Sequence, residues 1–380
     1  MKKVVVFLIL TSLCVFFQSL KTNAEAYDFE SIYSEQKESS GANDLEEKLP
    51  SNVKEDLNDI GITGVDLNEL TKVTPEKIFG KIFSMVEKRV PECSKSMFSI
   101  LAIIMLCALV ESFKLSLGEK PLSGAVNVIG VLCICTMVIM PITESINTMS
   151  KSLKATGHFM LCYMPVMAGI MVASGQAVTA TSYNGIMLII NEFIFQITNI
   201  FLIPVLNLFL AVSVASALSS KMKLTGLCDV FSKIIKWSLG LCMTVFVGVL
   251  TIQNVISAAA DSAGNKAAKF IISGFVPIVG GALGDAFSTI QACVKTLKTG
   301  VGAFFMIGCG FIFLPIIIEC LSFMLSVNVC LAVGEIFDLS AITALLKGIA
   351  KVLSTMLAFT LCCLFTLVVS TVLIITLGGS

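Results

Sequence analysis

The chain has few charged side chains for its length. Only 14% of its 380 residues are Asp, Glu, Lys or Arg, compared with about 25% in a typical soluble domain. The 26 basic and 26 acidic residues cancel, and the mean hydropathy is +0.93. This balance excludes an ordinary cytosolic enzyme, a basic nucleic-acid-binding protein and a disordered polyelectrolyte. It indicates a membrane protein.

Residues that serve catalysis and metal binding are also scarce. The chain has one tryptophan, one arginine and one histidine, His158, so no histidine cluster can form. Among its 14 cysteines, Cys133 and Cys135 are separated by one residue, and Cys362 and Cys363 are adjacent. Neither spacing suits a zinc or redox site, and buried cysteine behaves as a small apolar residue. With no hydrolase, zinc-protease or phosphate-loop motif present, we predict no enzyme activity, no metal site and no cofactor.

The first 26 residues have the pattern of a secretory signal peptide. Lys2 and Lys3 precede an apolar run over 4–17, and Ala24-Glu25-Ala26 places small residues where a signal peptidase reads them. The run is short for a membrane span, so an uncleaved anchor fits less well. We therefore expect residues 1–26 to direct export.

Residues 27–73 differ sharply in composition. Between positions 25 and 70 there are 13 acidic residues and three lysines, with few aromatic residues. Such a segment is expected to be exported and partly disordered, because it has little apolar surface to bury. Thr74-Pro75-Glu76 then has the pattern of a helix start, with a cap, a proline in the first helical position and an acid in the first turn. The apolar spacing that follows predicts an amphipathic interfacial helix over 74–92.

From residue 93 to 380 the sequence is a series of long apolar runs. Those at 121–143, 237–260, 299–318 and 352–380 are each long enough to cross a bilayer, whereas several others are shorter, or too long for one crossing. The pattern predicts an all-α polytopic membrane domain with about 8 to 10 spans. Its final span is expected at 352–377.

Short matches recur along this domain at offsets of 112 to 118 residues. They pair segments 163–169 with 275–281, 193–195 with 311–313, and 224–226 with 339–341, and Leu122-Ser123-Gly124 resembles the last pair. Their common order predicts an internal duplication, with repeats near 122–220 and 224–336. If the N-terminal region is exported and each run crosses once, the segments at Leu122, Leu224 and Leu339 are all cytoplasmic. Ten of the 14 lysines beyond Ser96 then lie inside, as the positive-inside rule requires.

Two groups of residues are candidates for function inside the apolar runs. The segment 274–285 is rich in glycine, and 165–169 is its counterpart. Broken helices of this kind line pores or act as gates, although glycine also allows helices simply to pack closely. The candidate pore or gating residues are Pro165, Gly169, Gly274, Pro277, Gly280, Gly281, Gly284 and Asp285.

The second group consists of acids in apolar surroundings, chiefly Glu192 and Glu319, with Glu111 as a third. An ionised carboxylate at the bilayer centre costs at least about 2.5 kcal/mol, so such residues often face a cavity or a partner. They could relay protons or cations, or lie near helix ends where the cost vanishes. Lysine-bearing helices at 224–236 and 339–351 are candidate docking surfaces, or anchors to anionic membrane lipid.

The segment 274–285, followed by Ala292-Cys293 and by Lys298-Thr299-Gly300-Val301-Gly302, resembles the stage III sporulation protein AE family of endospore-forming bacteria. The resemblance covers nearly the whole chain. It implies a multi-pass subunit of the mother-cell-derived outer forespore membrane, with its N-terminal region in the intermembrane space. The implied partners are other stage III sporulation proteins, including ring-forming subunits and a cytoplasmic ATPase, and no nucleic acid.

The resemblance further implies a permease-like contribution to a channel complex that links the mother cell to the forespore and supports forespore development. It transfers no catalytic residue. Two alternatives stay open at this point. One is a secondary transporter that uses Glu192 or Glu319 for ion coupling, and the other is a scaffold that assembles the complex without conducting.

Overall fold

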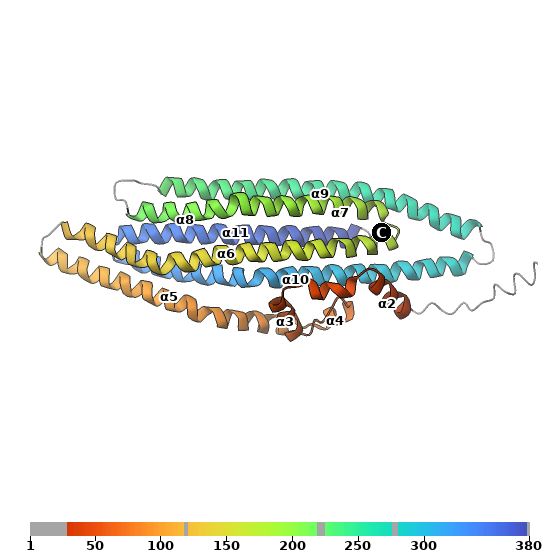
Figure 1. Cartoon of the computed structure of the whole chain (residues 1–380), viewed down its shortest axis with the longest axis horizontal. Coiled ribbons are helices and arrows are strands. Elements are labelled where there is room, and N and C mark those ends of the chain that lie inside the picture. The colour runs from red at the N-terminus through yellow and green to blue at the C-terminus, as the bar shows by residue number, and fades with distance from the viewer. Residues whose placement is uncertain (1–28, 118–120, 219–224, 276–279, 378–380) are drawn as a thin grey trace, which may run out of the picture.

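The computed structural model describes residues 29–117, 121–218, 225–275 and 280–377, and these residues form helices and turns without a strand (Figure 1). The all-α polytopic class is confirmed. An N-terminal domain of short helices comprises α2 (Phe29–Ser39), η1 (Ala42–Lys48), α3 (Ser51–Asp59) and α4 (Leu67–Lys72). The long helices are α5 (Pro75–Leu117), α6 (Pro121–Ala173), α7 (Ala177–Gln196), the π-helix η2 (Ile197–Leu202), α8 (Ile203–Leu218), α9 (Thr225–Phe275), α10 (Gly280–Ile336) and α11 (Ser340–Leu377). The expected signal peptide at 1–26 lies outside the described residues.

The long helices lie side by side in alternating directions and form one elongated bundle (Figure 1). Helices α7, η2 and α8 follow one another along a single rod. Helix α11 runs through the middle of the bundle and packs against α6, α8, α9 and α10. Its side chains fill the axis: Leu345, Leu346, Val352, Leu353 and Met356 are all fully buried. The described part of the bundle therefore has a solid apolar core.

The rods are much longer than a bilayer is thick. With 57 residues, α10 is about 85 Å long at 1.5 Å per residue, whereas the hydrocarbon layer measures about 30 Å. Six helices of the described residues are long and apolar enough to cross a membrane. The sequence predicted about 8 to 10 because charged residues such as Glu144 and Lys151 divide the apolar runs. Those residues interrupt the hydropathy of α6, but they do not break its helix.

Residues 29–73 are folded, in contrast to the partial disorder that their composition suggests. Most apolar side chains of this acidic segment are buried against the bundle. Val53, Leu57, Ile60, Ile62 and Val65 are each at most 2% exposed and belong to the same hydrophobic core as the bundle. The segment thus buries these side chains mainly against the long helices.

The N-terminal domain rests chiefly on α10, while η1 also packs against α6 and α3 is paired with the start of α5. Gly300 of α10 allows the backbone of the domain to come close, since a Cβ there would overlap the carbonyl oxygen of Val65. Lys81 of α5 lies 2.8 Å from Asp56 Oδ1 and 2.5 Å from Asp59 Oδ2. Its ammonium group holds the pKa of Asp59 below the usual range, chiefly through this hydrogen bond. Residues 74–92, expected as a separate interfacial helix, form the first part of α5, which continues through Pro91 without a break.

The matched segments of the predicted duplication can be placed in this fold. Leu224 and Leu339 each come directly before a long helix, α9 or α11. The 163–169 copy lies inside α6, whereas the 275–281 copy runs from the last residue of α9 to the second residue of α10. The duplication stays a prediction.

Replacing Gly300 with alanine should loosen the N-terminal domain. The added methyl group would push against a backbone carbonyl, which costs about 1–3 kcal/mol when the neighbour cannot move freely. Proteinase K digestion of the detergent-solubilised protein should then cleave the domain faster. Gly310→Ala is the matched control in the same helix, because a Cβ at Gly310 meets nothing within 4 Å. Equal cleavage rates for the two variants would contradict the docking contact.

Candidate functional site

Glu319 lies in a polar contact between three helices. Its side chain on α10 is 8% exposed and accepts a short hydrogen bond from the hydroxyl of Ser145, a fully buried residue of α6. Arg89 of α5 places Nη1 3.8 Å from Glu319 Oε2 and 3.9 Å from Glu92 Oε2. The single arginine of the chain thus faces Glu319, the more deeply buried of the two candidate acids whose side chains the structure describes.

These partners offset the free-energy cost of burying the Glu319 carboxylate in an apolar bundle. A buried carboxylate is tolerated when it is paired and hydrogen-bonded, and removing one partner then leaves a polar group unsatisfied. The network also joins α5, α6 and α10 at one level. The sequence indicated Glu319, but neither Ser145 nor Arg89. The presence of only one arginine was the one signal that could have suggested Arg89.

The structure gives less information on the surroundings of the other two acidic candidates. Glu111 is partly buried near the end of α5. Glu192 belongs to α7, but its side chain lies outside the described residues. The structure therefore brings Glu319 together with partners and leaves the role of Glu192 as a prediction.

The glycine and proline candidates fall in two places. Pro165 and Gly169 are exposed positions within the continuous helix α6, and a Cβ at Gly169 would meet nothing within 4 Å. Pro277 lies outside the described residues. The backbone of Gly274 belongs to the end of α9, and that of Gly280, Gly281, Gly284 and Asp285 to the start of α10, but their surroundings also lie outside what is described. Their pore or gating role stays a prediction.

A second polar cluster, which the sequence did not indicate, ties the turn between α6 and α7 to two other helices. Asp261 of α9 accepts hydrogen bonds from the backbone N–H groups of Val178, at 3.0 Å, and Thr179, at 2.8 Å. It thus caps the start of α7, where a negative charge is favourable. Lys298 of α10, only 3% exposed, donates to Gln176 Oε1 at 3.1 Å. Because Lys298 is two residues from Gly300, the same part of α10 holds both this turn and the N-terminal domain.

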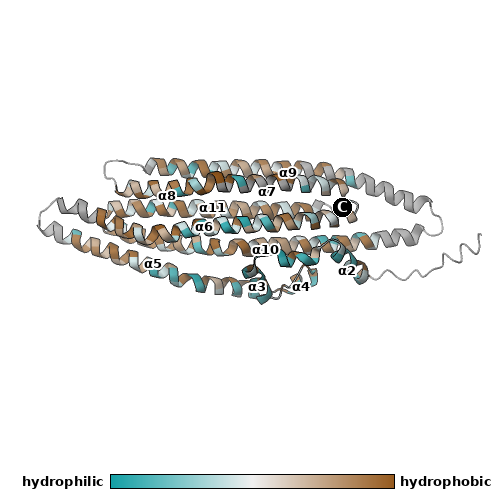
Figure 2. Ribbon diagram, viewed as in Figure 1, coloured by the Kyte–Doolittle hydropathy of each residue, from teal (hydrophilic) through white to brown (hydrophobic). Residues whose placement is uncertain are grey.

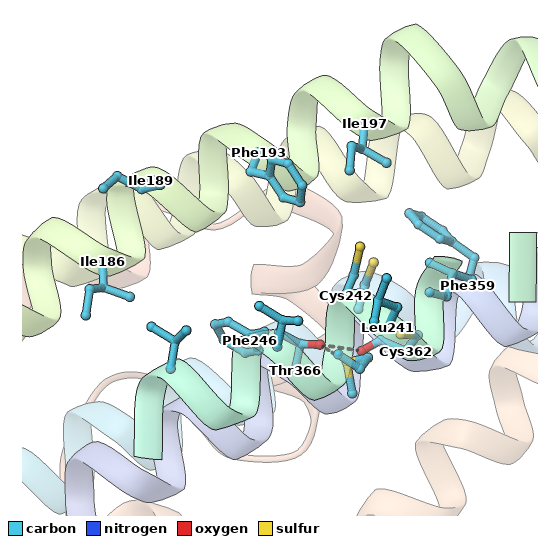
Figure 3. Close-up of a pocket in the computed structure, with 15 residues that line it drawn as sticks. Ile186, Ile189, Phe193, Ile197, Leu241, Cys242, Phe246, Phe359, Cys362 and Thr366 are labelled. Carbon is cyan, nitrogen blue, oxygen red and sulfur yellow. Dashed lines mark hydrogen bonds between the residues drawn. The ribbon is translucent and has the colours of Figure 1, made fainter. Parts of the chain in front are cut away.

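An apolar crevice lies between α7, η2, α9 and α11 (Figure 3). Its volume is about 470 Å³. The side chains that define it include Ile189, Phe193, Ile197, Val245, Phe359 and Cys362. The hydroxyl of Thr366 donates to the carbonyl oxygen of Cys362 at 2.8 Å and also lies against Met243 Sδ. This hydroxyl is satisfied within the protein, so the crevice offers a ligand only apolar contact.

A smaller pocket of about 270 Å³ lies between α8, α9 and α11, at the end of the bundle away from the N-terminal domain (Figure 1). Its polar lining consists of Ser213, Ser216, Ser340, Thr343, Lys347 and Lys351. Lys347 is 2.8 Å from Glu335 Oε1, and Lys351 pairs with Asp229. The two lysine-bearing segments predicted as docking surfaces therefore meet at one end of the bundle, with part of their charge neutralised.

Replacing Glu319 with leucine should lower the stability of the bundle. The change removes the hydrogen bond from the buried Ser145 hydroxyl to a carboxylate, which is worth about 1.5–3 kcal/mol, although the hydroxyl keeps the carbonyl oxygen of Pro141 as an acceptor at 3.0 Å. Glu319→Gln should cost less, because its amide oxygen still accepts that hydrogen bond. Thermal unfolding in detergent measures both variants. Glu335→Gln, on a half-exposed pair, should change stability by less than about 1 kcal/mol; an equal loss for this control would show that Glu319 has no special structural role.

Comparisons with known proteins identify the family of the chain. The family model for stage III sporulation protein AE matches residues 65–378, which include the last part of the N-terminal domain and all of the long helices. Stage III sporulation protein AE of Bacillus subtilis (strain 168) is 23% identical over 230 residues, which make up 60% of this chain and 57% of that protein. No solved structure matches the chain. The chain belongs to the stage III sporulation protein AE family.

Proposed function

We propose that this protein is a membrane-embedded, permease-like subunit of a sporulation channel complex that links the mother cell to the forespore, and that it is not an enzyme. The observation that carries the proposal is the family match over the whole bundle of long apolar helices. The folded N-terminal domain supports it, because an acidic domain held against the side of the bundle gives partner proteins a fixed surface.

The charges of the bundle suggest its orientation. Lys233, Lys236, Lys347 and Lys351 lie near the starts of α9 and α11, at the end opposite the N-terminal domain, and lysines concentrate on the cytoplasmic side of membrane proteins. Lys298, one of the ten lysines that the sequence placed inside, lies instead on the side of the N-terminal domain, where it donates to Gln176. In our proposal the end opposite the N-terminal domain faces the mother-cell cytoplasm and meets the ATPase. The N-terminal domain faces the intermembrane space of the outer forespore membrane and meets the ring-forming subunits.

The solid axis limits where solutes could pass. Because α11 fills the centre of the described bundle, the path we propose runs beside it, between this chain and its partners. The end of α9 and the start of α10, which are the described parts of the segment 274–285, would border that path. The solid axis also favours a second candidate function, a non-conducting scaffold. A transporter receives less support, since Glu319 is already paired with Ser145 and Arg89.

The combined change Gly280→Leu and Gly281→Leu should separate the channel from the scaffold. Two bulky side chains beside the path should block delivery of a small fluorescent solute to the forespore, while co-purification shows a complete complex. Gly240→Leu is the control, because a Cβ there meets nothing within 4 Å. Loss of the complex in the glycine variant, with normal delivery wherever complexes survive, would favour the scaffold.

The orientation can be tested with single cysteines in a cysteine-depleted chain. Asn43→Cys reports on the N-terminal domain and Asp338→Cys on the opposite end, and both positions are exposed. A membrane-impermeant maleimide added from outside vegetative cells that express the protein should label position 43 and leave 338 unlabelled until the cells are opened. The reverse result would invert the proposed topology.

A further inference from the structure

Contacts between neighbouring helices place positions on different helices on one scale of height along the bundle. Glu319 of α10 serves as the origin, because it lies level with Ser145 of α6 and Arg89 of α5. Two further contacts carry this height to α11 and then to α9, namely Gly302 with Ile375 and Thr366 with Met243. Counted along each helix at 1.5 Å per residue, the origin falls at about residue 235 of α9.

Two exposed apolar faces of the bundle lie at different heights on this scale. On α5 one face extends from Phe98 to Val110, about 14–32 Å from the origin in the direction away from the N-terminal domain. On α9 the other face extends from Leu241 to Ile256, about 9–32 Å from the origin in the opposite direction. The centres of the two faces are therefore about 43 Å apart along the bundle.

A single bilayer does not cover both faces. The hydrocarbon layer is about 30 Å thick, so it is thinner than the distance between the two centres. From α5 through α10 and α11 to α9 there are three steps of about 9 Å each, and one flat layer centred on both faces would need a tilt of at least about 55°. Membrane helices tilt by about 0–40°. One of the two faces is therefore covered by something other than lipid.

The face on α9 stands at the height of the hydrophilic parts of the molecule. The N-terminal domain contacts α10 at Gly300 and Gly308, about 17–29 Å from the origin on the same side of it. Between the origin and these contacts, α6 exposes the polar side chains of Lys151, Lys154 and His158. Figure 2 shows the hydrophilic ribbon of the N-terminal domain on the opposite side of the bundle from α7 and α9. The face on α9 is therefore the one that lies outside the lipid.

Helix α7 and η2 extend this face on the other side of the apolar crevice. Ile189 and Phe193 of α7 are 71% and 54% exposed, Val245 of α9 is 56% exposed, and all three line the crevice. In Figure 3, the α7 side chains stand across the crevice from those of α9 and α11. The exposed apolar residues of 178–200 and 241–256 thus form one surface with the crevice along its middle, the α7–α9 face.

The size of the α7–α9 face suits an interface between two copies of the chain. The residues 178–200 rise by about 33 Å, and two neighbouring helices are about 20 Å wide, so the face measures roughly 650 Å². Two copies that meet through it would bury about 1,300 Å², within the range of about 1,200–2,000 Å² that specific interfaces bury. The face is thus large enough for a stable dimer.

The composition of the face also favours a second copy as its partner. Helix α9 has no charged residue between 238 and 260, and α7 with η2 has only Glu192. A charged protein surface placed against this face would lose water without gaining partners for its charges. The same face on a second copy is as apolar as the first, so each covers the other.

Gly248 lies on this face, one helical turn from both Val245 and Ile252. A Cβ at Gly248 would meet nothing within 4 Å, so the fold of one chain does not require glycine there, and glycine costs about 1 kcal/mol relative to alanine inside a helix. A small residue on a helix surface lets a second helix approach closely. Such an approach explains the glycine.

We propose that two copies of the chain associate through the α7–α9 face, related by a twofold axis that runs along the bundle. Copies in one membrane share one orientation, so only an axis along the membrane normal places this face opposite itself. In the dimer, α9 of each copy lies against the crevice of the other. The proposal does not depend on the role of the protein in sporulation.

The test uses the full chain, expressed alone in vegetative cells and purified in a mild detergent. Size-exclusion chromatography with light scattering should show a dimer. Val245→Lys and Ile252→Lys each place a charge in the interface and should convert most of the dimer to monomer. Phe79→Lys is the matched control, because Phe79 is 69% exposed at a similar height on α5, outside the α7–α9 face. This variant should leave the dimer intact.

Cross-linking in intact membranes decides the matter if the lysine variants do not fold. In a cysteine-depleted chain, Val245→Cys or Ile252→Cys should give a covalent dimer with a short bis-maleimide, several-fold more than Phe79→Cys gives. A monomer in both assays would overturn the proposal, since lipid or another protein would then cover the face. A dimer that survives both lysine variants would overturn it as well, because the copies would then meet through a different surface.

Discussion

The packing of α11 along the bundle axis is the contact on which the rest of the structure depends. A helix with fully buried leucine, valine and methionine side chains on several sides needs neighbours all around it, and α6, α8, α9 and α10 supply them. Two close approaches show how tight this packing is. A Cβ at Gly348 of α11 would overlap Ser213 of α8, and one at Gly302 of α10 would overlap Ile375 of α11. The order of helices around the bundle follows from this central helix.

The polar contacts complete that packing at defined levels. Burial of Glu319 is tolerable because Ser145 and Arg89 meet it from two other helices. Asp261 and Lys298 likewise form hydrogen bonds that hold the turn between α6 and α7 against α9 and α10. Since apolar side chains alone permit helices to slide along one another, these few directional contacts fix the heights at which the helices stand. A bundle with so few charges uses several of them to set its register.

The fold class could be predicted from the sequence, but the continuity of the long helices and the folding of the N-terminal domain could not. Apolar runs identify membrane helices because lipid exposure and burial both favour the same side chains, and Thr74-Pro75-Glu76 correctly marked where α5 begins. The continuity of α6 through Pro141, Glu144 and Pro165 could not be seen, because hydropathy records polarity and not helical hydrogen bonding. The folding of residues 29–73 was hidden for another reason. Their apolar side chains are too few to form a core of their own, and the surface that completes the core lies on helices distant in the chain.

The continuity of the long helices has a mechanical consequence. An α-helix resists bending except at positions such as Pro315, and α10 continues as one helix past this proline to the face where Gly300 meets the N-terminal domain. A change of tilt inside the membrane is therefore transmitted as a lateral displacement of that domain, and it grows with distance from the pivot. In the opposite direction, a partner that pulls on the N-terminal domain would exert a torque on the buried contacts between the long helices.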